Sequence, residues 1–552
     1  MSRRILLPTC LLGLTLGLPV HAASVVDSVH NLSASGAGSI RASDESGVCM
    51  FCHTPHDASP DTPLWNRRLP GTTYTPYASS TAVAAPGQPT GASLLCLGCH
   101  DGTVALGDVL GRDEPIAMTG GTDRMPAGRA LTGTDLRHHH PVSFVYDAVL
   151  AGRQGELALP SALPPEIALD AAGQLQCTSC HDPHDDRFGA FLVMPNRNSR
   201  LCTTCHRPAG WHASAHARSD AAWTGAGPSP WPHSGETTVS GNGCRNCHEA
   251  HQAAGGPLLL RAAPEAAVCA ACHDGRMAAR DVMRDFEQFS AHPVPQTSLT
   301  HDPAEPAVVR DRHVSCSDCH GPHDHGAGPA DAPGQLRGVD LNNAAVEPAA
   351  HRWQVCLRCH GDSPGKRTPL VRRQFDQDNL RLEIQPANPS FHPVAAPGRN
   401  PDVPSLLPPW TPQSLVDCTD CHHSGDSARP HGSVHEPLLA RRYETRDRTP
   451  ESPSAYALCY GCHSRDSILR DASFAAHARH VRDASAPCSV CHDAHGISAT
   501  QGNPLNNSHL VNFDTTVVTA NTAGRLRFVD EGRFRGRCDL SCHGVEHRGE
   551  GY

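Results

Sequence analysis

The chain has 552 residues, and its 46 Lys and Arg residues against 56 Asp and Glu residues give a net charge of −10. This acidic balance argues against nucleic acid as a partner, because phosphate binding needs clustered basic side chains. Hydrophobic residues make up 38% and aromatic residues 5% of the chain, which is little for the three or four conventional cores that this length suggests. The unusual counts are 25 Cys and 38 His, so these two residue types are expected to carry the chemistry of the chain.

Residues 1–22 have the pattern of a secretory signal peptide, with Arg3 and Arg4 before an apolar stretch and small residues at the expected cleavage site. The alternative is an uncleaved anchor helix, but the apolar stretch is shorter than the roughly 20 residues that a membrane span needs. Cys10 and His21 would be removed with the signal peptide. We therefore expect an exported protein that is periplasmic, extracellular or associated with the outer membrane.

The other 24 cysteines form twelve pairs, and a histidine directly follows the second cysteine of every pair. Eleven of these motifs are C-x-x-C-H, and the twelfth is the longer C-x-x-x-C-H. We number them 1 to 12 in chain order: Cys49, Cys52, His53; Cys96, Cys99, His100; Cys177, Cys180, His181; Cys202, Cys205, His206; Cys244, Cys247, His248; Cys269, Cys272, His273; Cys316, Cys319, His320; Cys356, Cys359, His360; Cys418, Cys421, His422; Cys459, Cys462, His463; Cys488, Cys491, His492; and Cys538, Cys542, His543.

The C-x-x-C-H motif is the attachment signature of c-type haem. Its two thiols form thioethers with the two vinyl groups of one porphyrin, and its histidine becomes the proximal ligand of the iron. Twelve disulfides or six Cys₄ zinc sites are the alternatives for so many cysteines in an exported chain. Neither alternative requires a histidine after every pair. The motifs therefore predict twelve covalently attached c haems, and the longer twelfth motif fits if its extra residue loops out.

The remaining histidines supply candidates for the distal iron ligands. Methionine is scarce, with seven residues in the chain, so bis-His ligation is expected; it gives lower potentials than Met/His ligation. Motifs 1, 3, 5, 7 and 11 extend to C-x-x-C-H-x-x-H, and the histidines that end these extensions are His56, His184, His251, His323 and His495. Motif 9 lacks the extension, and His431 and His435 are the nearest substitutes there. Extended and plain motifs alternate, which indicates a repeat of two haems.

A second set of histidines precedes the motif pairs. His140, His292 and His392 each begin a His-Pro-Val sequence, and proline favours an extended conformation in the residue before it, which would present the ring from a loop. His30 has the same place before the first pair. For the third pair the candidates are His212, His216 and His233, and for the sixth pair they are His477 and His480.

One upstream and one extension histidine per pair would provide two distal ligands for two haems. His138, His139, His301 and His325 are predicted bystanders. The predicted distal ligands are His30, His56, His140, His184, His216, His251, His292, His323, His392, His431, His480 and His495.

The spacing of the motifs predicts one segment for each haem pair. About 44 residues per haem rarely build an apolar core of their own, so the haem faces must supply much of the buried surface. Short helical patterns lie near the motifs, and strand periodicity is weak. We expect a mostly irregular, elongated fold with short α-helices and little β structure around a stacked haem chain. The predicted segments after the signal peptide are 23–136, 137–209, 210–285, 286–372, 373–470 and 471–552.

These motifs resemble those of the multihaem c-type cytochromes with doubled C-x-x-C-H motifs, over nearly the whole chain after the signal peptide. The sequence that begins at Cys49 resembles the N-terminal module of that family, Asn242–His248 resembles a middle module, and the sequence that begins at Cys538 resembles the C-terminal closure. The resemblance implies exported electron carriers with closely spaced, mostly bis-His haems. It also favours His216 for the third pair and His431 for the fifth.

The predicted function is outer-sphere electron transfer through the haems to redox partners, namely other c-type cytochromes or quinol-oxidising membrane complexes. The alternative is a multihaem reductase of a small inorganic substrate, which needs one iron with an open face. No C-x-x-C-K motif occurs in the chain, so an open iron would have to be sought at motif 9 or 12. A third possibility is a subunit of an extracellular filament or of an outer-membrane conduit.

Overall fold

A computed structural model of the chain describes residues 24–60, 62, 64–296, 302, 304–309, 313–324, 336–424 and 429–551. The predicted signal peptide and the predicted bystanders His301 and His325 lie outside these described residues. Within the described part of the chain, no helix has both the length and the apolar character that crossing a membrane requires.

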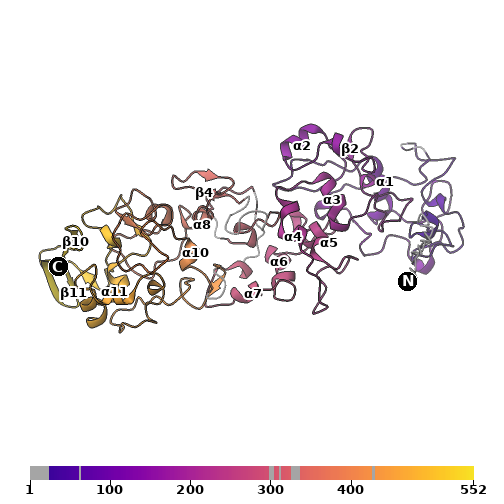
Figure 1. The fold of residues 1–552 in the computed structure, drawn as a ribbon. Coiled ribbons are helices and arrows are strands. Elements are labelled where there is room, and N and C mark those ends of the chain that lie inside the picture. Colours follow the sequence, from indigo (N-terminus) through magenta and orange to yellow (C-terminus); the bar gives the residue numbers. More distant parts are fainter. Residues whose placement is uncertain are drawn as a thin grey trace, which may run out of the picture. The chain divides into compact units, whose positions relative to one another are not determined.

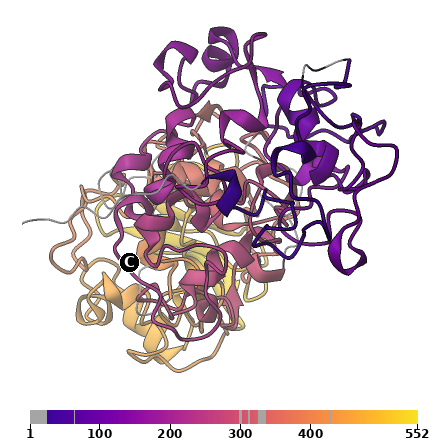
Figure 2. The same cartoon turned by 90° about the vertical axis from the view of Figure 1, so that its right-hand side faces the viewer.

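Short helices joined by long irregular segments make up most of the described chain (Figures 1 and 2). Even α1 has only ten residues. This confirms the predicted class of short helices in a mostly irregular fold with little β structure. The α-helices are α1 Gly91–His100, α2 Ala148–Gln154, α3 Arg200–Cys205, α4 Ala215–Arg218, α5 Val239–Asn242, α6 Glu265–His273, α7 Val282–Asp285, α8 Arg352–His360, α9 Leu380–Glu383, α10 Cys418–Cys421, α11 Arg465–Leu469 and α12 Cys488–Cys491.

The C-x-x-C-H motifs form helical turns. Motifs 2, 6 and 8 end the helices α1, α6 and α8 with their histidines. In seven other motifs the backbone N–H of the histidine donates to the carbonyl of the first cysteine, as from His53 to Cys49 at 2.8 Å. This turn brings the histidine back toward its two cysteines. The 3₁₀ turns at motifs 1, 3, 5, 7 and 10 are η2 Cys49–Phe51, η6 Cys177–Ser179, η9 Gly243–Asn246, η12 Cys316–Asp318 and η13 Cys459–Gly461.

The chain divides into two compact units. Unit 1 comprises residues 1–77, 84–196 and 200–205 and contains motifs 1 to 3 and the cysteines of motif 4. Unit 2 comprises residues 78–83, 197–199 and 206–552 and contains motifs 5 to 12. The division into six haem pairs stays a prediction.

Buried apolar residues of the described chain form small clusters in each unit. One cluster of unit 1 consists of Ala42, Phe51, Val109 and Ile116, and one of unit 2 consists of Val339, Leu357 and Ile384. Clusters of this size agree with the expectation that each motif has little apolar core of its own.

Most strands have two residues. In unit 2, two antiparallel pairings of such short strands position histidines. Strand β3 (Ser290–Ala291) pairs antiparallel with β7 (Gly432–Ser433), so that His292 follows β3 where His431 precedes β7. The N–H of His292 donates to the carbonyl of His431 at 3.2 Å. This pairing thus places the His-Pro-Val histidine His292 beside His431, which is distant in the sequence. The other short strands are β1 Phe144–Val145, β2 Gln174–Leu175, β4 Gly338–Val339, β5 Ala345–Val346, β6 Ser390–Phe391, β8 Gly496–Ile497 and β9 Val518–Thr519.

The second pairing joins β6 to β8 in the same antiparallel manner. Here the N–H of His392 donates to the carbonyl of His495 at 2.9 Å. The two pairings therefore repeat one arrangement at two places along the chain.

The C-terminus forms a longer sheet in which β10 (Arg527–Asp530), β11 (Gly536–Cys542) and β12 (Val545–Gly551) are neighbours and β9 also pairs with β11 (Figure 1). Its apolar face contributes to a cluster that includes Phe528 and Leu540. Both cysteines of motif 12 lie on β11. Motif 12 therefore differs from the other motifs in secondary structure as well as in length.

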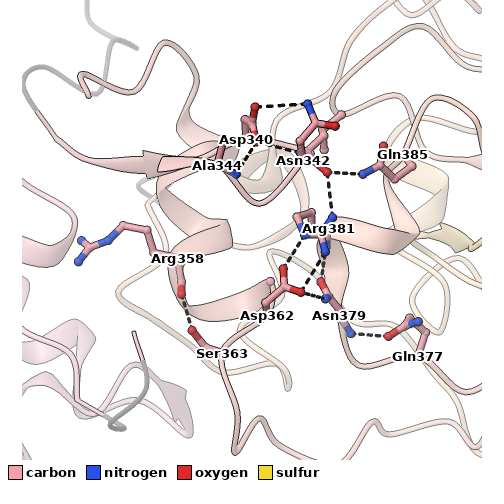
Figure 3. A network of polar contacts seen from close by, with 12 residues as sticks. Asp340, Asn342, Ala344, Arg358, Asp362, Ser363, Gln377, Asn379, Arg381 and Gln385 are labelled. Carbon is pink, nitrogen blue, oxygen red and sulfur yellow. Dashed lines mark hydrogen bonds and ion pairs between the residues drawn. The ribbon is translucent and has the colours of Figure 1, made fainter. Parts of the chain in front are cut away.

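A polar network connects the end of α8, which carries motif 8, to α9 (Figure 3). The guanidinium of Arg381 donates to the carboxylate of Asp362 and, at 2.9 Å, to the carbonyl of Leu341. The amide of Asn379 donates to the same carboxylate at 2.9 Å. The Arg381 guanidinium holds the pKa of Asp362 below its usual range. This network fixes α9, whose last residue, Glu383, approaches a predicted iron ligand.

Candidate haem sites

Eight motif histidines face a histidine from outside the motifs at a nearly constant separation. The ring centroids are 5.9 to 6.4 Å apart in every case. The motif histidine and the facing histidine are His53 and His184, His100 and His30, His248 and His323, His273 and His216, His320 and His431, His360 and His292, His422 and His495, and His492 and His477.

The separation does not depend on the angle between the rings, which ranges from 19° to 85°. Rings in direct stacking contact lie closer: His30 stacks on Phe191 at 4.0 Å and 13°. The rings of His53 and His184 are nearly as parallel, at 19°, yet they are 6.1 Å apart. A metal ion bound by an imidazole nitrogen at about 2 Å on each side separates the ring centroids by roughly 6 Å. The paired histidines therefore fit a haem iron with one imidazole on each face.

The extension histidines face motifs of the preceding pair. His184, in the extension of motif 3, faces His53 of motif 1. His323 and His495 face the histidines of motifs 5 and 9 in the same way, and His431 faces that of motif 7. The sequence pattern predicts that each extension histidine serves its own pair. The structure instead links successive pairs through these histidines.

The upstream histidines face the second motif of their own pair. His30 faces His100, and His216 and His292 face the histidines of motifs 6 and 8. For the fifth pair, His392 is near enough to His463 to lower its pKa, after the larger effect of burial.

A recurrent hydrogen bond ties the two kinds of histidine together. The Nδ1 atoms of His30 and His216 each contact, at 3.2 Å, the carbonyl of the proline that precedes an extension histidine. His292 contacts Pro430 in the same way at 2.7 Å, and His392 contacts Ala494. A carbonyl acceptor places the proton on Nδ1 and leaves the Nε2 lone pair for a metal.

Motif histidines are held in the same manner. Carbonyl oxygens lie 2.7 to 3.1 Å from the Nδ1 atoms of His100, His181, His248, His422 and His492. Burial, followed by the proximity of other histidines, lowers the pKa of several motif and distal histidines, so that they are neutral at pH 7 and in the form that binds a metal. The histidines whose pKa falls to about 4 are His360, His422, His463, His477 and His492.

Two distal candidates have a carboxylate near Nδ1. The carboxylate of Glu383 lies 3.3 Å from Nδ1 of His495, and that of Asp285 lies 3.7 Å from Nδ1 of His431. Both carboxylates are buried. Burial alone would lower the pKa of His495, but the contact with Glu383 raises this pKa to about 9. A carboxylate in this position increases the basicity of a ligating imidazole.

The cysteines of successive motifs also adjoin. Within a pair the second cysteines are neighbours: after burial, Cys99 is the main cause that raises the pKa of Cys52 to about 11. The corresponding neighbours are Cys180 and Cys205, Cys247 and Cys272, Cys319 and Cys359, Cys421 and Cys462, and Cys491 with Cys538 and Cys542.

Between pairs the first cysteines adjoin instead, with their thiols within hydrogen-bonding reach of each other. These are Cys96 and Cys177, Cys269 and Cys316, Cys356 and Cys418, and Cys459 and Cys488. In each unit, second-cysteine and first-cysteine contacts therefore alternate along the motifs.

The other predicted ligands have different surroundings. His56 is exposed, and none of the described histidine rings faces it. His251 is also exposed, and the Nδ1 of the half-buried His140 contacts the carbonyl of Pro141 at 3.0 Å. His480 faces His547 at 6.2 Å, and the Nε2 of His543 contacts Asp447 at 2.9 Å.

His547 is not among the ligand candidates that the sequence predicts. The only feature of the sequence that could have drawn attention to His547 is its position close after Cys542.

Comparison with known proteins concerns the motifs themselves. The family model described as the doubled CXXCH motif matches residues 170–210, 237–278 and 412–468. The chain is also similar to the multiheme cytochrome MtrA of Shewanella baltica (strain OS185), with 24% identity over 191 residues. The match covers 32% of this chain and 41% of that protein, so it spans less than half of the relative's length.

Proposed function

The chain is a multihaem c-type cytochrome, and from that premise we propose that it carries electrons between protein partners through twelve covalently attached haems. The proposed partners are other c-type cytochromes or quinol-oxidising membrane complexes. The proposed location is outside the cytoplasm, in the periplasm or at the cell surface. There the protein would serve respiration as a free carrier, as a filament subunit or in an outer-membrane conduit.

The observation that carries the proposal is the alternating contact of cysteines between successive motifs. A haem held by thioethers has its attached edge at its two cysteines. Neighbouring cysteines would therefore bring neighbouring haem edges together, at every step from motif 1 to motif 4 within unit 1 and from motif 5 to motif 12 within unit 2. An arrangement of this kind suits electron exchange between haems better than the binding of a separate substrate at each one.

The paired histidines favour outer-sphere transfer. Two imidazoles on one iron leave no coordination position for a small substrate, and the chemistry of such a haem is one-electron transfer. Burial and the engaged Nδ1 atoms keep several of these rings in the neutral form that binds a metal through Nε2. The paired rings therefore favour a carrier over a reductase.

Intact mass spectrometry of the exported protein tests the cofactor count. The mass should exceed that of the processed polypeptide by twelve haems. A mass with six or fewer haems would contradict the proposal, because it would leave alternate motifs empty and break the series of adjoining cysteines.

A further inference from the structure

A fully buried arginine, Arg67, lies at the contact between the first two haem motifs. The N–H of the residue before it, Asn66, donates to the carbonyl of Cys52 in motif 1 at 2.9 Å. The guanidinium of Arg67 donates to the carbonyl of Gly98, which stands between the cysteines of motif 2, at 3.4 Å. Arg67 is therefore held against both motifs of the first pair.

The charge of Arg67 has no ion-pair partner among the carboxylates of the described residues. Its other hydrogen bonds go to the backbone carbonyls of Ala105 and Leu106, each at 2.8 Å. The buried Nε atom has no hydrogen-bond partner within the described chain. Arginine stays protonated in proteins, so a full positive charge is buried here. Such a charge costs free energy, and proteins keep costly features of this kind mainly at functional sites.

The charge acts on the haem-binding cysteines of both motifs. Burial is the largest influence on the pKa of Cys52 and of Cys99, and it raises both pKa values. The Arg67 guanidinium is close enough to oppose this rise at each thiol. Because the two cysteines adjoin, haems attached to them would both have their attached edges near one guanidinium.

The second pair has an uncharged residue in the equivalent place. In motif 3 the N–H of Val193 donates to the carbonyl of Cys180 at 3.0 Å, as that of Asn66 does in motif 1, and the next residue is Met194. Met194 is also buried, and its sulfur accepts from the hydroxyl of Thr204 in motif 4 at 3.7 Å. Both Arg67 and Met194 thus connect the two motifs of a pair. Since a methionine suffices for this connection, the charge of Arg67 is an additional property.

We propose that Arg67 is a fixed charge that raises the reduction potentials of the two haems attached at motifs 1 and 2. On reduction each haem takes up one electron, from a redox partner or a neighbouring haem, and its iron passes from the ferric to the ferrous state. A nearby cation stabilises the reduced state, whose charge is lower by one, and burial limits the screening by salt. The inference rests on the proposed function, since it assumes that both motifs carry a haem.

Redox titration of the full-length, haem-loaded cytochrome, followed by haem absorbance, tests the proposal. Arg67→Gln keeps a donor for the backbone carbonyls but removes the charge. We expect this variant to retain twelve haems and to have two lowered potentials. Each one-electron equilibrium should change about tenfold, which corresponds to ~60 mV. Arg67→Lys keeps the charge and should leave both potentials nearly unchanged.

Arg68→Gln is the matched control, because Arg68 is the next residue along the chain but is exposed. Solvent and salt screen its charge, so its removal should displace no potential. If Arg67→Gln does not fold, Arg67→Met provides the same test, since motif 3 accommodates a methionine in this place.

Unchanged potentials in a folded Arg67→Gln or Arg67→Met variant with twelve low-spin haems would overturn the inference and leave the proposed function intact. An equal fall in Arg67→Lys would also overturn it, because the effect would then come from altered packing. An equal fall in Arg68→Gln would overturn it as a general effect of charge. A wild-type protein without haem at motif 1 or 2 would contradict the proposed function together with the inference.

Discussion

His184 and His56 occupy the same place in their motifs, yet only His184 faces a motif histidine among the described residues. We expect His184→Ala to convert one low-spin haem, that of motif 1, into a high-spin haem that binds CO after reduction. The potential of this haem should rise, because a ligand that stabilises the ferric iron is lost. CO difference spectra and a redox titration measure both effects.

His56→Ala is the matched control for this prediction and should change neither the spin state nor CO binding. If both variants gain a CO-binding haem, the pairing across successive motif pairs is incorrect. If neither does, His184 is not a ligand.

The carboxylate of Glu383 gives a second prediction at the scale of single residues. In Glu383→Gln the His495 imidazole loses electron donation from a nearby negative charge, so the haem of motif 9 should become easier to reduce. The expected rise in its potential is on the order of 60 mV, which corresponds to a tenfold change in a one-electron equilibrium. Spectroelectrochemical titration should find one potential displaced.

Glu347→Gln is the control, since that exposed carboxylate bonds to Arg337. The same displacement in the control would show a general charge effect and contradict a specific role for Glu383.

At the scale of elements, the pairing of β6 with β8 depends on the glycine that follows His495. A Cβ atom at Gly496 would overlap the carbonyl oxygen of Glu383 and come within 2.9 Å of the Cβ of Phe391. Gly496→Ala should therefore separate the strands and lower the free energy of unfolding of the haem-loaded protein by about 1–3 kcal/mol.

Chemical denaturation followed by haem absorbance would measure this change. Gly71→Ala is the control, because a Cβ atom at Gly71 would have no neighbouring atom of the described chain within 4 Å, and this variant should leave the stability nearly unchanged. Equal losses in the two variants would show that the close contact at Gly496 is unimportant.

The local elements could be predicted from the sequence, but their connections could not. Short helical patterns near the motifs predict helices there, and His-Pro-Val predicts a histidine in an extended segment. The pairing of His292 with Pro430, or of His392 with Ala494, joins residues more than 100 positions apart. Such pairings depend on short strands of two residues, whose sequence pattern is too brief to recognise.

Motif 12 shows the same limit. Its sequence pattern predicts two cysteines and a histidine that bind one haem from consecutive positions along the chain. In the structure, both cysteines lie on β11 and His543 lies in the turn that joins β11 to β12. The register of β11 and β12, which brings His547 beside Leu540, is visible only in the structure.

At the scale of the whole molecule, the described apolar clusters are too small to fold the chain without its cofactors. The cluster at the C-terminal sheet has six buried residues, and others have three or four. Since the haem faces must supply the remaining apolar surface, we expect the chain exported without haem attachment to be unfolded. Limited proteolysis and circular dichroism test this, and a compact, protease-resistant haem-free chain would contradict it.

The central claim is that the haems form a series of bis-His centres that carry electrons and bind no substrate. Low-temperature EPR of the oxidised wild-type protein, quantified against its haem content, tests this claim most directly. We predict that all the haem iron is low-spin. A high-spin signal equivalent to one haem or more would contradict the claim, because such a signal means that an iron has an open axial position.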